Sequence, residues 1–203
     1  MTRIWALGAA VLLALMIGGT ALWTSLGQNA PCGGGAVAGG TAAIGGPFTL
    51  VDTQGETVTD AQVIDRPTLV YFGYTYCPDV CPLDVSRNLD VVDRLAAKGI
   101  NAKPVFITVD PERDTRQVMA DYTEAMGANL VALTGSADQI AAAAKAYRVY
   151  YAKVPGDDPE YYLMNHSAYT YLMLPGNGLA TYFKQDAKAG DMADTAACYI
   201  GSS

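Results

Sequence analysis

A run of 20 residues without a charged side chain, from Ile4 to Trp23, constrains most strongly how this chain can fold. As a helix rising about 1.5 Å per residue, the run is roughly 30 Å long, which matches the hydrocarbon thickness of a bilayer. Arg3 precedes the run, and no further Lys or Arg occurs before Arg66. Because positive residues stay on the cytoplasmic side, this pattern predicts that the rest of the chain is exported.

Two interpretations of this run are open. In the first, residues 1–26 are a single-pass anchor in the inner membrane. In the second, they are a signal peptide cleaved near Ser25-Leu26-Gly27, although the apolar region of such peptides usually spans only about 7–15 residues. The length favours the anchor, and both interpretations place the following residues on the periplasmic side.

Residues 27–46 are predicted to be a flexible linker, because eight of these 20 positions are glycine. Residues 47–203 are then left as a single folded domain, which is long enough to bury a core. The chain of 203 residues carries 13 Lys and Arg against 20 Asp and Glu. This acidic balance argues against a nucleic acid partner, since phosphate binding needs clustered positive charge.

From Phe48 onward, strand patterns alternate with helix patterns. β-Branched and aromatic runs bounded by turns predict strands, and capping residues with terminal glycines predict helices. The predicted strands are 48–52, 56–60, 68–75, 103–110, 129–134, 161–165, 168–174 and 181–185. The predicted helices are 79–98, 114–127, 136–152 and 187–200. Strand–helix alternation followed by a late pair of strands predicts an α/β fold with a mixed sheet.

Two helices carry more detailed expectations. Asp114 has Gln117 three residues later, which is a capping-box pattern and predicts that the helix begins at Asp114. In the helix over 79–98, one apolar face is expected to be buried. The residues expected on that face are Leu83, Leu89, Val92, Leu95 and Ala96.

The sharpest chemical signal is Cys77-Pro78-Asp79-Val80-Cys81, which follows a predicted buried strand and opens a helix. Backbone N–H groups and the helix dipole at such a turn favour the thiolate, the form that binds metals and attacks disulfides. A stabilising disulfide, a redox-active dithiol and a metal site are all open on spacing alone. A disulfide across so short a loop would remove little entropy from the unfolded chain.

His166 is the single histidine of the chain, 85 residues beyond Cys81. A late strand of a compact sheet can return beside an early helix, where one imidazole and two thiolates would form a set of three ligands. Sulfur ligands select Cu(I), and imidazole suits either copper state. Zinc is a weaker candidate, because it usually takes four ligands.

Three segments together resemble the Sco/SenC family of copper-binding assembly factors. The first segment is Tyr71–Pro82, and the second is Asp110–Thr115. The third is Tyr162–Ser167, followed by Tyr171-Leu172-Met173. The resemblance covers about residues 45–200, with the segments in the same order and an N-terminal anchor before them.

This resemblance implies a thioredoxin-like fold, with a mixed sheet flanked by helices, that carries one copper ion as Cu(I) or Cu(II). The ligands by position are Cys77, Cys81 and His166. The resemblance further implies a role in building the binuclear copper centre of cytochrome c oxidase subunit II, either by giving copper to it or by reducing its cysteines. Of these two roles, we expect that of a metallochaperone, which is not an enzyme. A periplasmic thiol reductant or a copper donor would be a second partner. The family usually has an acidic residue before the histidine, where this chain has Asn165, which bears on docking or copper affinity.

Two other functions stay open beside the metallochaperone. A thiol–disulfide oxidoreductase would use Cys77 and Cys81 to reduce the copper-site cysteines of the oxidase subunit. A redox or copper sensor would pass a signal to another membrane protein. Cys32 and Cys198 could form a disulfide in an exported domain. The segment Asp110–Thr115 is explained as a strand end followed by a helix cap.

Overall fold

The computed structural model describes Cys32 and residues 44–154, 161–176 and 178–202. The chain divides into two compact units, Met1–Gly33 and Gly34–Ser203, and the fold given below is that of the second unit. The predicted anchor, residues 1–26, lies outside the described residues. Within the described ranges, no helix has the length and apolar character needed to cross a membrane.

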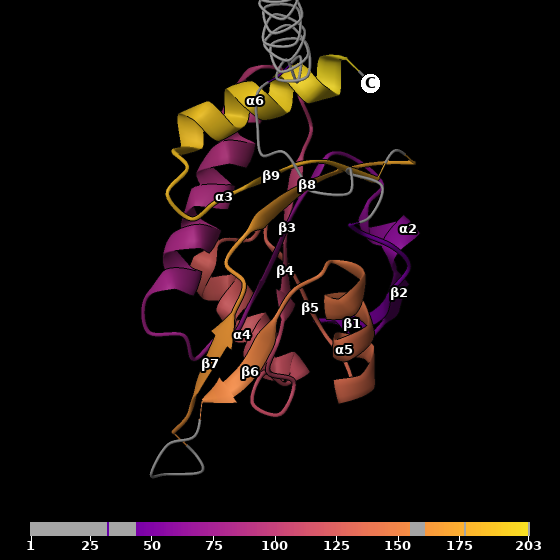
Figure 1. Ribbon diagram of the computed structural model, residues 1–203, viewed down its shortest axis with the longest axis vertical. Helices are drawn as coiled ribbons and strands as arrows, with labels where there is room; N and C mark the ends of the chain where they lie inside the picture. The colour runs from indigo at the N-terminus through magenta and orange to yellow at the C-terminus, as the bar shows by residue number, and fades with distance from the viewer. Residues whose placement is uncertain (1–31, 33–43, 155–160, 177, 203) are drawn as a thin grey trace, which may run out of the picture. The chain divides into compact units, whose positions relative to one another are not determined.

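The second unit is built on a mixed seven-stranded sheet in the order β2-β1-β5-β4-β3-β8-β9 (Figure 1). The inner strands β3, β4 and β5 are parallel, whereas β1, β8 and β9 are antiparallel to their neighbours. The strands are β1 (Thr49–Asp52), β2 (Thr57–Thr59), β3 (Thr68–Gly73), β4 (Lys103–Thr108), β5 (Val131–Thr134), β8 (Thr170–Leu174) and β9 (Gly178–Phe183). The predicted mixed α/β architecture is confirmed.

Helices cover both faces of this sheet (Figure 1). The helices are α2 (Asp60–Val63), α3 (Val80–Ala97), α4 (Arg116–Met126), α5 (Ala137–Ala146) and α6 (Ala189–Gly201). Helix α3 packs against α6, and α5 lies on the opposite side of the sheet. β3 is buried along its whole length, so its side chains meet both layers. Phe72 contacts Tyr147 at the end of α5, while Tyr71 stacks on Phe106.

The buried face of α3 agrees only in part with the predicted one: Val92 and Leu95 are buried and Leu89 is partly buried, as expected. Leu83 is 63% exposed and Ala96 is also exposed, whereas Asp84 and Asn88 are buried. Each of these polar side chains has a partner: Asp84 pairs with Arg87 at 2.9 Å, and Asn88 accepts a hydrogen bond from Thr170 Oγ1 at 3.0 Å. A pattern search for apolar residues overlooks such positions, because polar groups are buried only when a partner satisfies them. Here the partners are Arg87 on the next turn of α3 and Thr170 on β8.

Helix α4 begins later than predicted. Its N-cap is Thr115, whose side chain accepts a hydrogen bond from Val118 N. Asp114 is instead fully buried, and its carboxylate accepts hydrogen bonds from Thr75 N at 3.0 Å and Thr108 Oγ1 at 2.5 Å. Asp114 therefore ties the loop after β4 to the loop after β3, a role that needs groups 39 residues apart.

The predicted helix over 136–152 is too long. Its capping box at Ser136 and Gln139 is confirmed, but α5 ends at Ala146 and Arg148 takes a left-handed φ of 54°. The following residues form a strand, β6 (Tyr151–Val154), which pairs with β7 (Leu163–His166) as a separate two-stranded sheet. The sequence gives no stop signal here, because the residue that turns the chain is arginine rather than glycine.

Candidate metal centre

The two motif cysteines lie at the junction between β3 and α3. Cys77 belongs to the connecting loop, and Cys81 is the second residue of the helix. The Cys81 N–H donates a hydrogen bond to Cys77 Sγ at 3.3 Å. This N–H belongs to the first helical turn, where backbone donors have no partner within the helix. The helix N-terminus therefore stabilises negative charge on the Cys77 sulfur.

The pKa values of the two thiols are shifted in opposite directions. The pKa of Cys77 is lowered to about 5, first by a hydrogen bond from the Cys81 thiol, and also by the N–H groups of Asp79 and Cys81. The pKa of Cys81 is raised, because its proton is held against the Cys77 sulfur and because it is buried. In the metal-free protein at neutral pH, one thiolate and one thiol therefore share a single proton.

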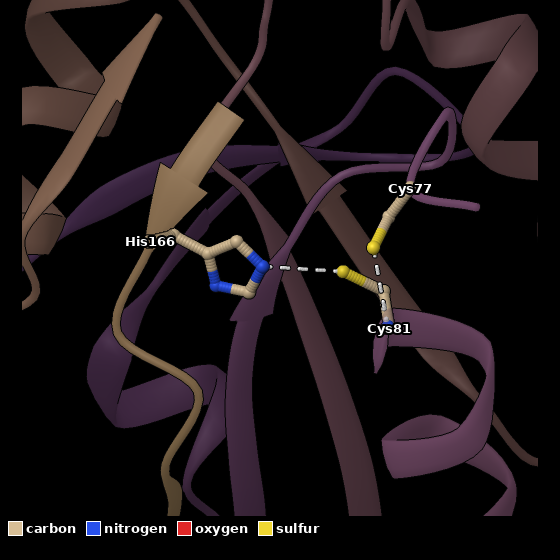
Figure 2. Close-up of side chains that lie close together, drawn as sticks. All are labelled: Cys77, Cys81 and His166. Atoms are coloured by element: carbon tan, nitrogen blue, oxygen red, sulfur yellow. Dashed lines mark hydrogen bonds between the residues drawn. The ribbon is translucent and has the colours of Figure 1, made fainter. Parts of the chain in front are cut away.

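His166 is the last residue of β7, and its imidazole points from the hairpin toward the cysteines (Figure 2). The imidazole makes T-shaped contacts with two buried tyrosine rings, Tyr71 and Tyr74, at interplanar angles of 87° and 88°. Nδ1 lies 3.2 Å from the carbonyl oxygen of Ser167, which can only accept, so Nδ1 carries the proton. Nε2 is then the nitrogen that is free to bind a metal, and it lies 3.3 Å from Cys81 Sγ.

Together these side chains form a compact group of soft donors. The donor atoms of Cys77, Cys81 and His166 all lie within 4.8 Å of one another. Metal–sulfur and metal–nitrogen bonds of about 2.3 and 2.0 Å place two ligands of one ion no more than about 4.6 Å apart. The group is therefore close to the size that a single ion requires, and two sulfurs with one imidazole suit copper. Both cysteines are buried and the histidine is partly exposed.

Gly73, at the end of β3, makes room for this group. A Cβ atom at Gly73 would lie 2.9 Å from Cys81 Sγ and 2.8 Å from the Phe106 ring. Neither contact is tolerated without a shift of the sulfur or the ring. The glycine therefore lets the strand pass close to the sulfur.

The other residues singled out in the sequence lie around the group but outside it. Asp79 is the exposed N-cap of α3, and its side chain makes no capping hydrogen bond. Asn165 is exposed on the face of β7 opposite to His166, as the alternation along a strand requires. Cys77 and Cys81 are free thiols, whereas Cys32 and Cys198 are disulfide-bonded.

The second motif, Asp110–Thr115, reaches the same region, which the sequence interpretation missed. Arg113 from this motif contacts Tyr162, which precedes β7, and Tyr76, which precedes Cys77. The sequence signal was present, since Arg113 and Tyr162 both lie inside the motifs that carried the resemblance. Their mutual contact depends on how the β6–β7 hairpin folds back, and β6 was not predicted.

Comparison with known proteins points to one family. The model of the SCO1/SenC family matches residues 36–201. Protein SenC from Rhodobacter capsulatus is 49% identical over 161 residues, which is 79% of this chain and 72% of that protein. The human mitochondrial Protein SCO1 homolog is 38% identical over 159 residues, which is 77% of this chain but 53% of that protein. This chain therefore matches only about half of the human relative's length.

A solved structure gives the same result. The crystal structure of Arabidopsis thaliana ScoI with copper bound superposes with a TM-score of 0.76 at 36% identity. The match covers 79% of this chain and 100% of that chain. The mixed sheet, the flanking helices and the cysteine pair at the start of α3 thus form a thioredoxin-like fold of the kind seen in Sco structures.

Proposed function

This chain belongs to the SCO1/SenC family, and we propose that it is a copper metallochaperone. It binds one copper ion through Cys77, Cys81 and His166. The observation that carries this proposal is the convergence of three soft donors, from a loop, a helix and a separate hairpin, to within 4.8 Å. Copper bound to the related Arabidopsis protein supports the choice of metal.

The protein's own groups prepare the site for the ion. Cys77 is already a thiolate above pH 5 or so, given its lowered pKa of about 5. Cys81 keeps its proton until a cation replaces that proton as the partner of both sulfurs. His166 offers Nε2, because Nδ1 donates to the carbonyl oxygen of Ser167. Each ion that binds therefore releases at least the Cys81 proton.

Copper is the cargo, and three ligands leave it accessible to an acceptor. His166 lines an open surface depression together with Ser167–Tyr169 and Lys184–Asp186. An incoming ligand can approach the ion on the side of His166, which is the one partly exposed ligand of the three, while both cysteines are buried. The acceptor is the binuclear copper centre of cytochrome c oxidase subunit II, as the family resemblance implies. Transfer is a ligand exchange, in which acceptor ligands replace protein ligands and the cysteines regain their proton.

The proposal includes a tether to the inner membrane. Residues 1–26 form a single-pass anchor, and residues 27–46 form a glycine-rich linker. The end of this linker already contacts the domain, since Gly45 N donates to Ala146 O at 2.9 Å. The folded domain, residues 47–203, then faces the periplasm, where it reaches an acceptor in the same membrane. Fractionation of cells before and after alkaline extraction tests this part, because an anchored chain stays with the membrane and a cleaved one is released.

Copper loading of the full chain tests the site. The reduced protein is incubated anaerobically with Cu(I), desalted, and assayed for bound metal by mass spectrometry. Wild-type protein and Asn165→Ala are expected to hold one copper ion per chain, because Asn165 faces away from the donors. Cys77→Ser and His166→Ala are expected to lose tight binding. Undiminished loading of both variants would refute the assignment.

A second candidate is the thiol–disulfide oxidoreductase, which the acidity of Cys77 favours. Its thiolate would attack a disulfide of the partner, and Cys81 would resolve the mixed disulfide. The partner gains two thiols, and Cys77 and Cys81 become a disulfide that a thiol reductant must reduce again. This function predicts that His166→Ala keeps reductase activity while either Cys→Ser variant loses it.

A further inference from the structure

Arg113 makes an ion pair, a hydrogen bond and contacts with three tyrosine rings beside the candidate metal centre. It lies in the loop between β4 and α4, with its side chain 14% exposed. Its Nε atom pairs with Asp110 Oδ2 at 2.6 Å, and Asp110 is itself 3% exposed. A buried, hydrogen-bonded pair of this kind fixes the direction of the guanidinium, because Arg presents its donors in a rigid plane.

The guanidinium closes a ring of contacts with Tyr162. Arg113 Nη1 donates to the Tyr162 carbonyl oxygen at 2.9 Å, and its Cζ lies 3.5 Å from the centroid of the Tyr162 ring. The Tyr162 hydroxyl donates to Asp110 Oδ1 at 2.7 Å. Backbone, ring and hydroxyl of one residue are thus all held by the same Asp110–Arg113 pair. Tyr162 directly precedes β7, the strand that ends in His166.

The same guanidinium reaches the segment that carries the cysteines. Arg113 Cζ lies 4.8 Å from the ring centroid of Tyr76, the residue before Cys77. It also lies 5.8 Å from the centroid of Tyr74, whose ring meets the imidazole of His166. Arg113 therefore contacts both segments whose separation sets the distance from the cysteines to the histidine.

In the part of the chain that the structure describes, no strand of the main sheet pairs with β6 or β7, so side-chain contacts hold the hairpin against the body. Residues 167–169 connect β7 to β8 of the main sheet, and Tyr151 of β6 and Met164 of β7 pack, partly buried, against the main core. Near Tyr162, the Asp110–Arg113 pair supplies polar contacts to the body. Lys153 adds an ion pair to Glu112 at 3.2 Å, but both of those side chains are exposed, so that pair contributes little.

We infer that Arg113 is a positioning residue that holds the β6–β7 hairpin so that His166 faces Cys77 and Cys81. It provides no ligand, but its loss lets the imidazole move away from the sulfurs. The functional importance of this positioning rests on the proposed copper site, whereas the contacts themselves are those of the metal-free protein. The second motif, Asp110–Thr115, would thus hold the cysteine motif and the histidine motif together.

The test compares Arg113→Lys with Arg116→Lys in the full chain. Lysine keeps the charge beside Asp110 but loses the planar set of donors and the stacking. Arg116 is a matched control, since it is exposed at the start of α4 and donates to Gln54 O, away from the site. Because His166 is the single histidine, its carbethoxylation by diethyl pyrocarbonate reports its exposure in metal-free protein. Arg113→Lys is expected to speed this reaction severalfold, and Arg116→Lys to leave it unchanged.

The second readout is a double-mutant cycle on Cu(I) affinity. Arg113→Lys is expected to weaken binding about tenfold when His166 is present, and to have no further effect in the His166→Ala background. Equal weakening in both backgrounds would mean a general structural defect and would overturn the inference. Unchanged modification rate and affinity in Arg113→Lys would also overturn it.

Two further outcomes are distinguishable. If Arg113→Lys fails to fold, Asp110→Asn replaces it, because that variant removes the charge that pairs with the Arg113 guanidinium while its amide oxygen can still accept from the Tyr162 hydroxyl. The same faster modification and weaker binding are expected, and their absence contradicts the inference. If wild-type protein binds no copper, the proposed function fails, while the histidine modification rates still decide whether Arg113 positions His166.

Discussion

At the scale of single residues, the Cys77–Cys81 pair is the feature that governs reactivity. The Cys81 thiol donates toward Cys77, which lowers the pKa of Cys77 to about 5 and raises that of Cys81. The more exposed cysteine, Cys77 with 8% of its surface exposed against 0% for Cys81, is thus the charged one. Cys77 is therefore the nucleophile, and the more deeply buried Cys81 keeps the proton.

Alkylation by iodoacetamide as a function of pH should reveal this asymmetry. Because a lowered pKa keeps Cys77 ionised at neutral pH, its alkylation rate should rise through a midpoint near 5 and be level above pH 6.5 or so. In Cys81→Ala the main donor is lost, so the midpoint should move upward toward the ordinary cysteine pKa of about 8.5. Peptide mapping identifies the modified sulfur. A midpoint that stays near 5 in Cys81→Ala would contradict the shared proton.

Asp84 and Arg87 form a second residue-scale feature, a buried ion pair under the site. Burial raises the pKa of Asp84 in spite of Arg87, so ionising this pair is costly. Asp84 Oδ2 and Arg87 Nε and Nη2 are buried without a hydrogen-bond partner among the described residues. The pair is therefore a weak source of stability, although each partner needs the other.

Urea denaturation of single and double variants tests this interpretation. Asp84→Ala should lower the free energy of unfolding by about 3 kcal/mol, because it leaves the Arg87 charge buried without its partner. The double variant Asp84→Leu with Arg87→Met should recover most of that loss, since an apolar pair avoids the desolvation of two charges. A double variant at least as unstable as Asp84→Ala would show that the pair itself stabilises the fold.

At the scale of elements, the centre depends on β3, α3 and the β6–β7 hairpin meeting at one point. The end of β3 passes so close to Cys81 that only glycine fits at position 73. The first turn of α3 supplies the donor to the Cys77 sulfur. The hairpin brings His166 from 85 residues away. Small displacements of any of these elements therefore change the distances between the donor atoms.

Gly73→Ala tests the close approach of β3. The added methyl group should push Cys81 Sγ or the Phe106 ring aside, which should cost about 1–3 kcal/mol of stability and weaken copper binding. Gly190→Ala in α6 is the matched control, because the nearest atom to its Cβ is Arg94 Nη1 at 3.9 Å. That change should leave copper binding intact and should not lower the melting temperature, since alanine favours a helix over glycine. Full copper affinity in Gly73→Ala would contradict the packing argument.

At the scale of the whole molecule, the alternation of apolar and capping patterns was sufficient to predict the mixed α/β fold. β3, β4 and the Ser136 capping box were local signals, and each is confirmed. The proximity of the donor atoms was only one possibility on the residues alone and was implied by the resemblance, because no local pattern reports that a strand 85 residues later returns to a helix. That proximity is a property of the tertiary structure alone.

The parts that sequence could not predict share one physical cause. β6 is a strand only because β7 pairs with it, and Asp114 is buried only because Thr75 and Thr108 donate to it. Asp84 and Asn88 likewise depend on Arg87 and Thr170. In each case the partner lies on another element or turn, and the residue alone predicts exposure. Polar groups and paired strands are therefore less predictable than apolar helix faces and caps.

X-ray absorption at the copper edge of the loaded full chain tests the central claim most directly. Two sulfur ligands and one imidazole nitrogen ligand are expected around each ion. In His166→Ala, any residual copper should keep its sulfur ligands and lose the imidazole scattering. A site with no sulfur ligand, or an imidazole signal unchanged in His166→Ala, would contradict the assignment of Cys77, Cys81 and His166.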